Sequence, residues 1–332
     1  MAKINREKIT IMLMMYKIKK FLGDPYYVLG NFMMKHCPKL MSDKYFLKVK
    51  WKRCMGYELD LKHPKTFNEK LQWLKLYDRR PEYTIMVDKY RAKQWVEDKV
   101  GKQYVIPTLA IYNSAEKIDL NQLPDQFVLK CNHDSGSVVI CRDKKSFDFD
   151  AAKQKLSKAL KKNYYWDSGE WPYKHVKPLI LAEPFLFESE ADDINDYKFY
   201  CFDGEPKVFY ITSNREGVGG VREDFFDING NHLDMNQKGY FVNDTLPIIP
   251  KGINVMINLA RKLSIGMKHL RVDFYESSDR LFVGELTFYD GAGFSPFYPD
   301  EWNSIVGDWI KLPTDDIKHC VFSANSICER TK

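Results

Sequence analysis

The stretch that decides the fold consists of two short apolar segments, His269-Leu-Arg-Val-Asp-Phe-Tyr275 and Leu281-Phe-Val-Gly-Glu-Leu-Thr-Phe288. Polar and apolar residues alternate in both, and Ser278-Asp279 between them is a turn signal, so the pattern predicts an antiparallel hairpin. Side chains two residues apart point to the same face of a strand. In a suitable register, one face of this hairpin therefore carries four polar side chains, Arg271, Asp273, Glu285 and Thr287.

Two carboxylates and a guanidinium on one sheet face are costly to bury without partners. Carboxylate oxygens are ligands that Mg²⁺ prefers, and a guanidinium matches phosphate or acyl-phosphate oxygens. We interpret the face as a site for Mg²⁺ and a phosphorylated group. The alternative is a plain cross-strand ion pair.

A second polar residue in an apolar setting lies nearer the N-terminus. Phe127-Val-Leu-Lys-Cys131 predicts a buried strand that contains Lys130, and Val138–Cys141 predicts its hairpin partner. The turn between them includes Ser135-Gly-Ser137, which can direct backbone N–H groups at phosphate. Lys130 and this turn together suggest a phosphate site, although a structural strand-end lysine gives the same pattern. Neither a GxxxxGK[ST] loop nor a GxGxxG motif is present.

Two more segments carry charged residues at the ends of predicted elements. Asp88-Lys89 begins a predicted helix, where Asp88 serves as a cap and Lys89 is either solvated or functional. Leu179-Ile-Leu-Ala-Glu183 predicts a strand that ends at Pro184. Glu183 is then either a strand-terminating residue or part of a hinge whose backbone meets the edge of an adenine ring.

Helical and strand patterns alternate in blocks, which predicts an α+β fold. Apolar spacing predicts helices within 66–100, 148–163 and 255–267, and a hairpin over 196–210 around Asp203-Gly204. A short strand broken by Pro107 is expected over 104–112.

Composition sets the broad class. The chain has 332 residues, 44% of them hydrophobic, and a net charge of +6, which describes a folded protein. Its seven cysteines include no CxxC pair, and we find neither an 18-residue apolar run nor a signal-peptide pattern. These features predict a cytoplasmic protein. No nucleic-acid-binding motif is present, so no nucleic-acid partner is expected.

Basic residues gather in residues 1–56, with apolar residues between them at helical spacing. Such a segment can lie on an anionic bilayer, which would bring the protein to the inner face of the membrane as a peripheral contact. The alternative is a helical cap whose lysines are solvated.

The order of these features resembles that in ATP-grasp ligases. More narrowly, Lys65–Lys75, Asp196–Gly204 and Gly284–Phe294 (GELTFYDGAGF) resemble the teichuronopeptide-biosynthesis, or TupA-like, ATP-grasp family over about residues 60–310. Members occur with capsule and surface-polysaccharide genes and are often labelled glycosyltransferases. The resemblance implies an ATP-grasp fold of two α+β subdomains that clasp ATP, with ATP and Mg²⁺ as cofactors.

The resemblance also implies a role for each matching residue. Lys89 and Lys130 would hold the nucleotide phosphates beneath the loop Ser135, Gly136 and Ser137. Glu183 would meet the adenine amino group, Leu186 the ring, and Asp196 the ribose hydroxyls, with Lys198 also in the nucleotide site. Asp273, Glu285 and Thr287 would be the metal ligands, Arg271 would steady the acyl-phosphate, and Arg222 or Arg215 would reach the γ-phosphate.

Four regions follow from this reading. They are a basic helical region (1–86), an ATP-grasp N-subdomain with the phosphate loop (87–185), a C-subdomain with the Mg²⁺-binding strands (186–310) and a C-terminal tail (311–332). Two departures from the family pattern stand out. Thr287 replaces the usual asparagine ligand, with Asp290 as a substitute, and the usual N-terminal α/β domain is not visible.

The resulting hypothesis is an ATP-dependent carboxylate–amine ligase that forms an amide through an acyl-phosphate. The family implies a sugar uronate as the acid and an amino acid or other amine as the acceptor. Aromatic residues in 164–173 would stack on sugar rings or simply pack in the core. A glycosyltransferase is the alternative, although its one Asp-x-Asp candidate, Asp148-Phe-Asp150, precedes a helix that Asp150 would cap. A non-catalytic scaffold with a degenerate nucleotide site is the third hypothesis.

Overall fold

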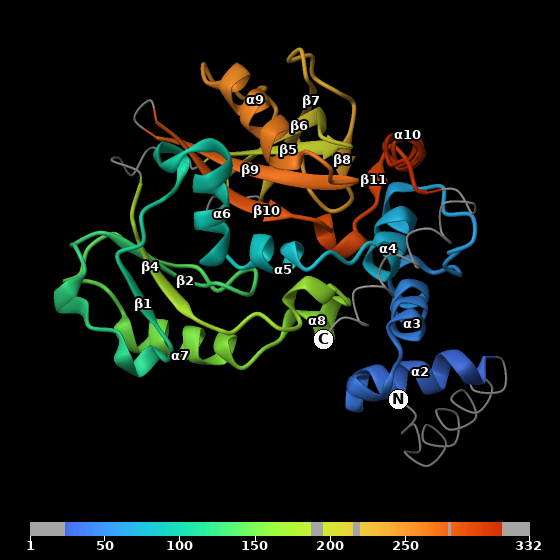
Figure 1. Ribbon diagram of the computed structural model, residues 1–332, viewed down its shortest axis with the longest axis horizontal. Helices are drawn as coiled ribbons and strands as arrows, with labels where there is room; N and C mark the ends of the chain where they lie inside the picture. Colours follow the sequence, from blue (N-terminus) through green and yellow to red (C-terminus); the bar gives the residue numbers. More distant parts are fainter. Residues whose placement is uncertain (1–23, 187–194, 215–219, 278–279, 314–332) are drawn as a thin grey trace, which may run out of the picture.

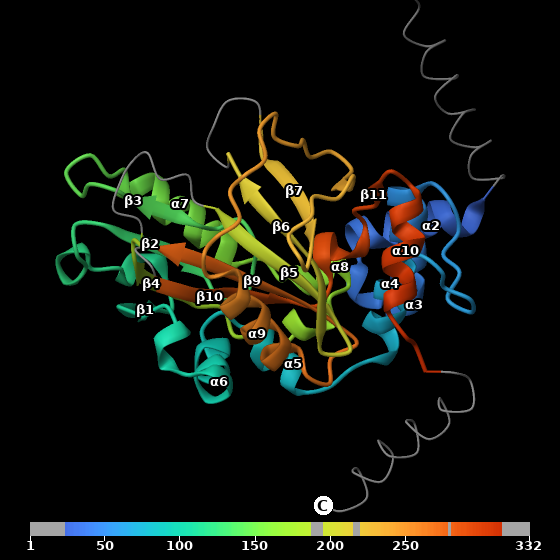
Figure 2. The same ribbon diagram turned by 90° about the horizontal axis from the view of Figure 1, so that it is seen from above.

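The computed structural model describes residues 24–186, 195–214, 220–277 and 280–313. Its N-terminal part is helical, as the sequence predicts for the described residues of 1–86. The helices are α2 (Pro25–His36), α3 (Asp43–Met55), α4 (Phe67–Tyr77), α5 (Glu82–Val87) and α6 (Arg91–Val100), with short 3-10 turns at Pro38–Leu40 and Lys102–Tyr104. Figures 1 and 2 show α2, α3 and α4 together with α10 (Glu301–Trp309) at one end of the molecule.

A four-stranded antiparallel sheet forms the first layer of strands. Its order is β1-β4-β2-β3, from β1 (Ala110–Tyr112), β2 (Phe127–Cys131), β3 (Val139–Cys141) and β4 (Ile180–Pro184). Helix α7 (Phe149–Leu160) packs on β2 and closes a small separate core. Between β1 and β2 lie 3-10 turns at Ala115–Lys117 and Leu120–Gln122, and α8 (Tyr164–Ser168) and η5 (Trp171–Tyr173) connect α7 to β4.

A five-stranded antiparallel sheet forms the second layer, in the order β10-β9-β5-β6-β7. Its strands are β5 (Asp196–Phe202), β6 (Glu205–Ser213), β7 (Arg222–Asp227), β9 (His269–Ser277) and β10 (Arg280–Thr287). Helix α9 (Ile253–Ser264) covers one face, where aromatic and aliphatic side chains form the main core (Figure 1). The short strands β8 (Asn236–Gln237) and β11 (Phe297–Tyr298) pair beside it, and η6 (Asp290–Gly293) follows β10.

The register of β9 and β10 is the one required by the shared polar face. Glu285 lies opposite Asp273 and Thr287 opposite Arg271. A register shift between Val283 and Glu285 produces this pairing. The same face continues onto β5, where Lys198 lies opposite Asp273. The predicted juxtaposition of the four polar residues is therefore confirmed.

Helix α4 links the N-terminal helices to the rest of the fold. Its first turn has a capping box, in which Thr66 accepts from the backbone N–H of Glu69 and the Glu69 carboxylate accepts from that of Thr66. In the middle of the helix, Gln72 donates to the backbone oxygens of Ala292 and Gly293 in η6. This helix thus supports the turn that follows β10.

Most predicted elements are present, and two details of the sequence reading are wrong. The strand expected over 104–112 is reduced to β1, because Tyr104 and its neighbours belong to a 3-10 turn. Asp148, not Asp150, is the N-cap of α7, where its carboxylate accepts from the Ala151 N–H at 2.9 Å. Within the described residues, every helix is too short or too polar to cross a bilayer. The four region boundaries remain predictions.

Candidate active site

A cleft of about 1560 Å³ opens between the two sheets. Both sheets contribute polar side chains to its wall, as does the segment around α8. Twelve of the site residues expected from the sequence line the cleft: Lys89, Lys130, Ser135, Gly136, Ser137, Glu183, Leu186, Asp196, Lys198, Arg271, Glu285 and Thr287. Asp273 does not line it, but contacts two residues that do, Arg271 and Lys198.

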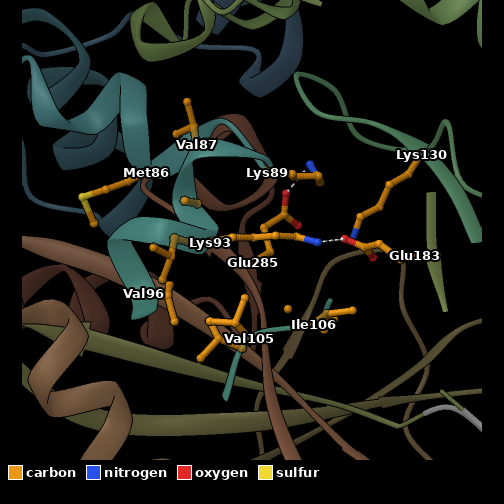
Figure 3. Close-up of a pocket in the computed structure, with 14 residues that line it drawn as sticks. Met86, Val87, Lys89, Lys93, Val96, Val105, Ile106, Lys130, Glu183 and Glu285 are labelled. Carbon is orange, nitrogen blue, oxygen red and sulfur yellow. Dashed lines mark ion pairs between the residues drawn. The ribbon is translucent and has the colours of Figure 1, made fainter. Parts of the chain in front are cut away.

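Glu183 is the centre of the cluster at one end of the cleft, which we call the nucleotide end (Figure 3). Its two carboxylate oxygens lie 2.7 Å from the ammonium groups of Lys93 and Lys130. Lys130 arrives from the neighbouring strand β2, and Lys93 from α6. Burial raises the pKa of Glu183, but the two lysines outweigh burial and hold the pKa below its ordinary value. The carboxylate is therefore ionised at neutral pH.

Lys89 joins the nucleotide end to the polar face of the five-stranded sheet. Its ammonium group lies 2.7 Å from a Glu285 carboxylate oxygen and donates to the backbone oxygen of Asp134, also at 2.7 Å. Asp88 fixes the chain just before it by accepting from the Asn132 amide at 2.8 Å. Helix α6 begins at Arg91, later than the sequence predicts, with Tyr90 as its N-cap residue, so Asp88 lies just before the helix. The Asp88 carboxylate accepts from the backbone N–H groups of Tyr90 and Arg91, and Lys89 is a cleft residue rather than a solvated one.

The loop after β2 divides into a fixed and an open part. The Ser137 hydroxyl is buried, donates to Asp134 at 2.6 Å and accepts from the Cys131 N–H at 2.9 Å. Ser135 and Gly136 are exposed, and Gly136 has a φ of +91°, which favours glycine. Ser135 and Gly136 thus remain available to a phosphate, whereas the Ser137 side chain is engaged within the loop.

Asp273 is held by two cations on the sheet face. Arg271 approaches it with two nitrogens at 2.7 Å, and Lys198 lies 2.5 Å from it and 3.2 Å from Asp196. Burial raises the pKa of Asp273, but the neighbouring guanidinium and ammonium groups lower it below its ordinary value. The face is therefore a charge-balanced network.

Arg271 has a second partner that the sequence reading proposed only as a metal ligand. Its guanidinium contacts the Asp290 carboxylate and donates to Thr287 Oγ1 at 3.2 Å. Asp290 also accepts hydrogen bonds from Tyr200 and Gln237. Asp290 thus orients Arg271 from the turn η6.

The donor set on this face suits Mg²⁺. Asp273 and Glu285 supply hard carboxylate oxygens from directly opposite positions of paired strands. Among the described residues no group of three or more His, Cys, Asp or Glu side chains is arranged around one metal position. Mg²⁺ usually takes only one or two carboxylates and completes its shell with water and substrate phosphate, so these two residues fit.

The two arginines expected to reach the γ-phosphate, Arg222 and Arg215, differ from the other candidates. Arg222 donates to the backbone oxygen of Val242 at 3.0 Å, stacks on Phe241, and is not among the residues that line the cleft. This arrangement does not place Arg222 on the cleft wall, and its contact with the γ-phosphate stays a prediction. Arg215 lies outside the described residues.

Sequence reasoning missed Lys93, although a signal was available. It follows Lys89 by four residues, and residues four apart share one face of a helix. It also missed the pair Lys75 and Glu170. Glu170 lines the cleft together with Tyr164 and Tyr173, in the part here called the acceptor end, and Lys75 is fully buried behind this wall. No local pattern marks these two, because they are far apart in sequence.

The sequence matches the family described as TupA-like ATPgrasp over residues 69–311, well over half of the chain. The match confirms the expected fold, an α+β ATP-grasp fold, and the expectation of an ATP-grasp enzyme. No curated protein matches the chain.

Three similar solved structures are all ligases by name. D-alanine–D-alanine ligase from Helicobacter pylori is 15% identical, with a TM-score of 0.40, and the match covers 82% of this chain and 84% of that one. L-amino acid ligase from Bacillus licheniformis is 10% identical, with a TM-score of 0.41 and coverages of 76% and 55%. D-alanine–D-alanine ligase from Bacillus anthracis, complexed with ATP, is 14% identical, with a TM-score of 0.33 and coverages of 61% and 54%. This chain therefore spans just over half the length of the last two.

Proposed function

We propose, from the premise that this chain belongs to the TupA-like ATP-grasp family, that it is an ATP-dependent carboxylate–amine ligase. ATP would phosphorylate a carboxylate, and an amine would displace phosphate from the acyl-phosphate to form an amide. The observation that carries the proposal is the pairing of Asp273 and Glu285 beside Arg271, with Lys89 reaching the same face from across the cleft.

Positioning and charge stabilisation account for the phosphoryl step in this proposal. Lys89 and Lys130 would bind the ATP phosphates, and Arg271 would steady the developing acyl-phosphate. Glu183 would receive the adenine amino group at the nucleotide end, with Leu186 beside the ring and Asp196 near the ribose. Mg²⁺, when held by Asp273 and Glu285, would offset the charge of the phosphates. Thr287 contributes less to the metal, since Arg271 already donates to its hydroxyl.

A sugar uronate is the acid we propose, with an amino acid or related amine as acceptor, in surface-polysaccharide biosynthesis. Tyr164 and Tyr173 line the cleft between the loop after β2 and the metal strands, where aromatic rings can stack on a sugar. Tyr165 and Trp171 are used differently, since Tyr165 packs on Trp166 and the Trp171 indole donates to Tyr289.

The first experiment is calorimetry with a non-hydrolysable ATP analogue and Mg²⁺, beside UDP-sugars. We expect Mg²⁺-dependent binding of the analogue and none of the UDP-sugars. The second is a hydroxylamine trap, in which D-glucuronate, Mg-ATP and hydroxylamine yield a hydroxamate and ADP if an acyl-phosphate forms. Binding of a UDP-sugar but not of the ATP analogue would overturn the ligase and favour a glycosyltransferase. The Asp-x-Asp candidate gives that alternative little support, because Asp148 caps α7.

A peripheral membrane contact is the second part of the proposal. On α2, Tyr26, Leu29 and Phe32 recur at three-residue spacing and are 61%, 52% and 59% exposed. The exposed cations Lys35 and Lys39 follow them. An apolar stripe beside lysines complements an anionic bilayer, as at the inner face of the membrane.

Vesicle sedimentation tests this contact with the full chain. We expect binding to phosphatidylglycerol vesicles, little binding to phosphatidylcholine vesicles, and a clear loss in Leu29→Asp. Equal sedimentation with both lipids, or full binding by the variant, would contradict it.

A further inference from the structure

The acceptor end of the cleft contains a buried carboxylate that the phosphoryl step does not use. Glu170 is only 3% exposed and still lines the cleft. Its backbone is fixed by its neighbours, since Gly169 ends α8 in the left-handed conformation at φ +72° and Glu170 itself is the N-cap residue of η5, which has Pro172 in its first turn. A Cβ at Gly169 would come within 2.7 Å of Leu47, so the chain is closely packed there. Glu170 is therefore rigidly presented at the wall of the cleft.

Lys75 is the buried cation that accompanies it. Its side chain is fully buried, and its ammonium group donates to the backbone oxygens of Ser168 and Ala292, both at 2.8 Å. The ring of Phe294 lies 4.8 Å from the same nitrogen. Lys75 therefore joins the turn that carries Glu170 to η6, the turn that carries Asp290.

The electrostatic surroundings of Glu170 come from several elements. Burial raises its pKa to about 7, Lys75 and a hydrogen bond with Ser168 oppose the rise, and Glu285 and Asp290 add to it. Burial likewise lowers the pKa of Lys75, an effect that Glu170 opposes. The other titratable groups that interact with Glu170 are Lys50, Tyr164, Tyr173 and Tyr289. Trp171, the next residue along the chain, donates to the Tyr289 hydroxyl at 3.1 Å just after β10, so the turn that carries Glu170 packs against the end of that metal-face strand.

We propose that Glu170 is the catalytic residue that receives the proton of the attacking amine, with Lys75 as its positioning residue. This assignment rests on the proposed ligase function. An amine arrives as an ammonium ion, which cannot attack until it loses a proton. A carboxylate on the cleft wall, held on a rigid turn that packs against the end of β10, has the charge and location for that transfer.

The step balances as follows. The ammonium ion gives one proton to the Glu170 carboxylate, and the freed nitrogen lone pair attacks the acyl carbon. The carbon–oxygen bond to phosphate then breaks, and phosphate leaves with the electron pair. The nitrogen loses its second excess proton to the departing phosphate, which leaves a neutral amide. Glu170 returns its proton to solvent before the next turnover.

The first test needs no substrate. The full chain, labelled with glutamate carrying ¹³C in its carboxyl group, is titrated by NMR between pH 5 and 9. We expect one carboxyl resonance that titrates near neutrality in the wild type and is absent from Glu170→Gln. If Glu170→Gln does not fold, Glu170→Asp takes its place, because it also removes the Glu170 resonance. A Glu170 resonance that titrates in the ordinary acidic range would overturn the assignment.

The second test compares two nucleophiles with D-glucuronate and Mg-ATP. Hydroxylamine is largely uncharged at neutral pH and needs no base, whereas glycine attacks only after losing a proton. Glu170→Gln should reduce amide formation with glycine by about 100-fold and hydroxamate formation by less than about 3-fold. Glu170→Asp should recover part of the glycine rate, and Glu205→Gln, which changes an exposed glutamate paired with Arg261, is the matched control.

The outcomes separate the two proposals. An equal loss with both nucleophiles would show that Glu170 only supports the fold, and would overturn the proton-acceptor role. If the wild type forms no hydroxamate, the proposed uronate substrate fails, and the NMR titration still decides the assignment of Glu170.

Discussion

Glu183 and Glu170 are both buried glutamates on the wall of one cleft, yet their pKa values shift in opposite directions. Burial raises both. Glu183 has a lysine 2.7 Å from each carboxylate oxygen, and these two contacts outweigh burial. Lys75, which lowers the pKa of Glu170 more than any other neighbour, donates its ammonium group to two backbone oxygens instead.

The opposite pKa shifts suit the two glutamates to different tasks: Glu183 to ligand binding and Glu170 to proton transfer. A carboxylate that stays ionised at all working pH values can hold a ligand, but it is a poor proton acceptor. A carboxylate that titrates near neutrality can accept and release a proton in each turnover. We therefore expect changes at the nucleotide end to alter ATP binding, and changes at the acceptor end to alter only the amide-forming step.

The largest effect is expected from Glu285→Ala, which removes a carboxylate from the metal face. ATP turnover should fall by about 10³-fold or more, because both metal binding and charge offset are lost. The measurement is ADP release, with circular dichroism to show that the fold is retained. Arg280→Gln, at the exposed start of the same strand, is the control. Retained turnover in Glu285→Ala would refute the metal assignment.

The next effect concerns ATP affinity. Lys130→Ala should weaken binding of the ATP analogue by about 10- to 100-fold, because a charge-assisted contact to phosphate is lost. Calorimetry on Glu170→Gln should give a dissociation constant within about 3-fold of the wild type, since that residue lies at the other end. Comparable losses in the two variants would mean that the two ends do not have separate roles.

A pH series should separate the ends without mutation. The pKa values of Glu183, Asp273 and Glu285 are all lowered, so these groups stay charged as the pH falls from 8 to 6. Mg-ATP analogue affinity should change by less than about 3-fold over that range. The raised pKa of Glu170 has the opposite consequence, and amide formation should decline as the pH falls below neutrality. An ATP affinity that declines in parallel would contradict the distinction.

The smallest effect is expected at the cap of α4, the helix that carries Lys75. Thr66→Ala removes a side-chain acceptor from the capping box and should lower the free energy of unfolding by about 1 kcal/mol. Urea denaturation measures the change, and Thr84→Ala, in the short helix α5, serves for comparison. ATP-analogue affinity should not change. A large loss of affinity would show that α4 also supports the nucleotide end.

The nucleotide end and the polar face of the five-stranded sheet could largely be predicted from the sequence, because their residues sit in strong local patterns. Lys130 interrupts an apolar strand, Glu183 ends one, and strict alternation puts Arg271 and Asp273 on one face. The acceptor end could not be predicted. The contact of Lys75 with Ser168 spans 93 residues, and that with Ala292 spans 217, so no local spacing reports either of them. Lys75 also lies within a helix where a lysine is ordinary.

Arg222 could not be placed from the sequence either. It begins strand β7, and the direction of its side chain depends on Val242 and Phe241, which belong to a loop without regular periodicity. The register shift near Glu285 is a third case. It decides which residue lies opposite Asp273, and alternation alone does not specify it.

The contact between Lys89 and Glu285 has a consequence for how the cleft fills. The Lys89 ammonium group and the Glu285 carboxylate neutralise each other from elements on opposite sides of the cleft. Under the proposed function, binding would be an exchange of counter-ions, in which Glu285 would pair with Mg²⁺ and Lys89 with the nucleotide phosphates. Mg²⁺ alone, or the nucleotide alone, would leave one of these two charges without a partner in a buried setting. Mg²⁺ and the nucleotide would therefore bind most favourably together.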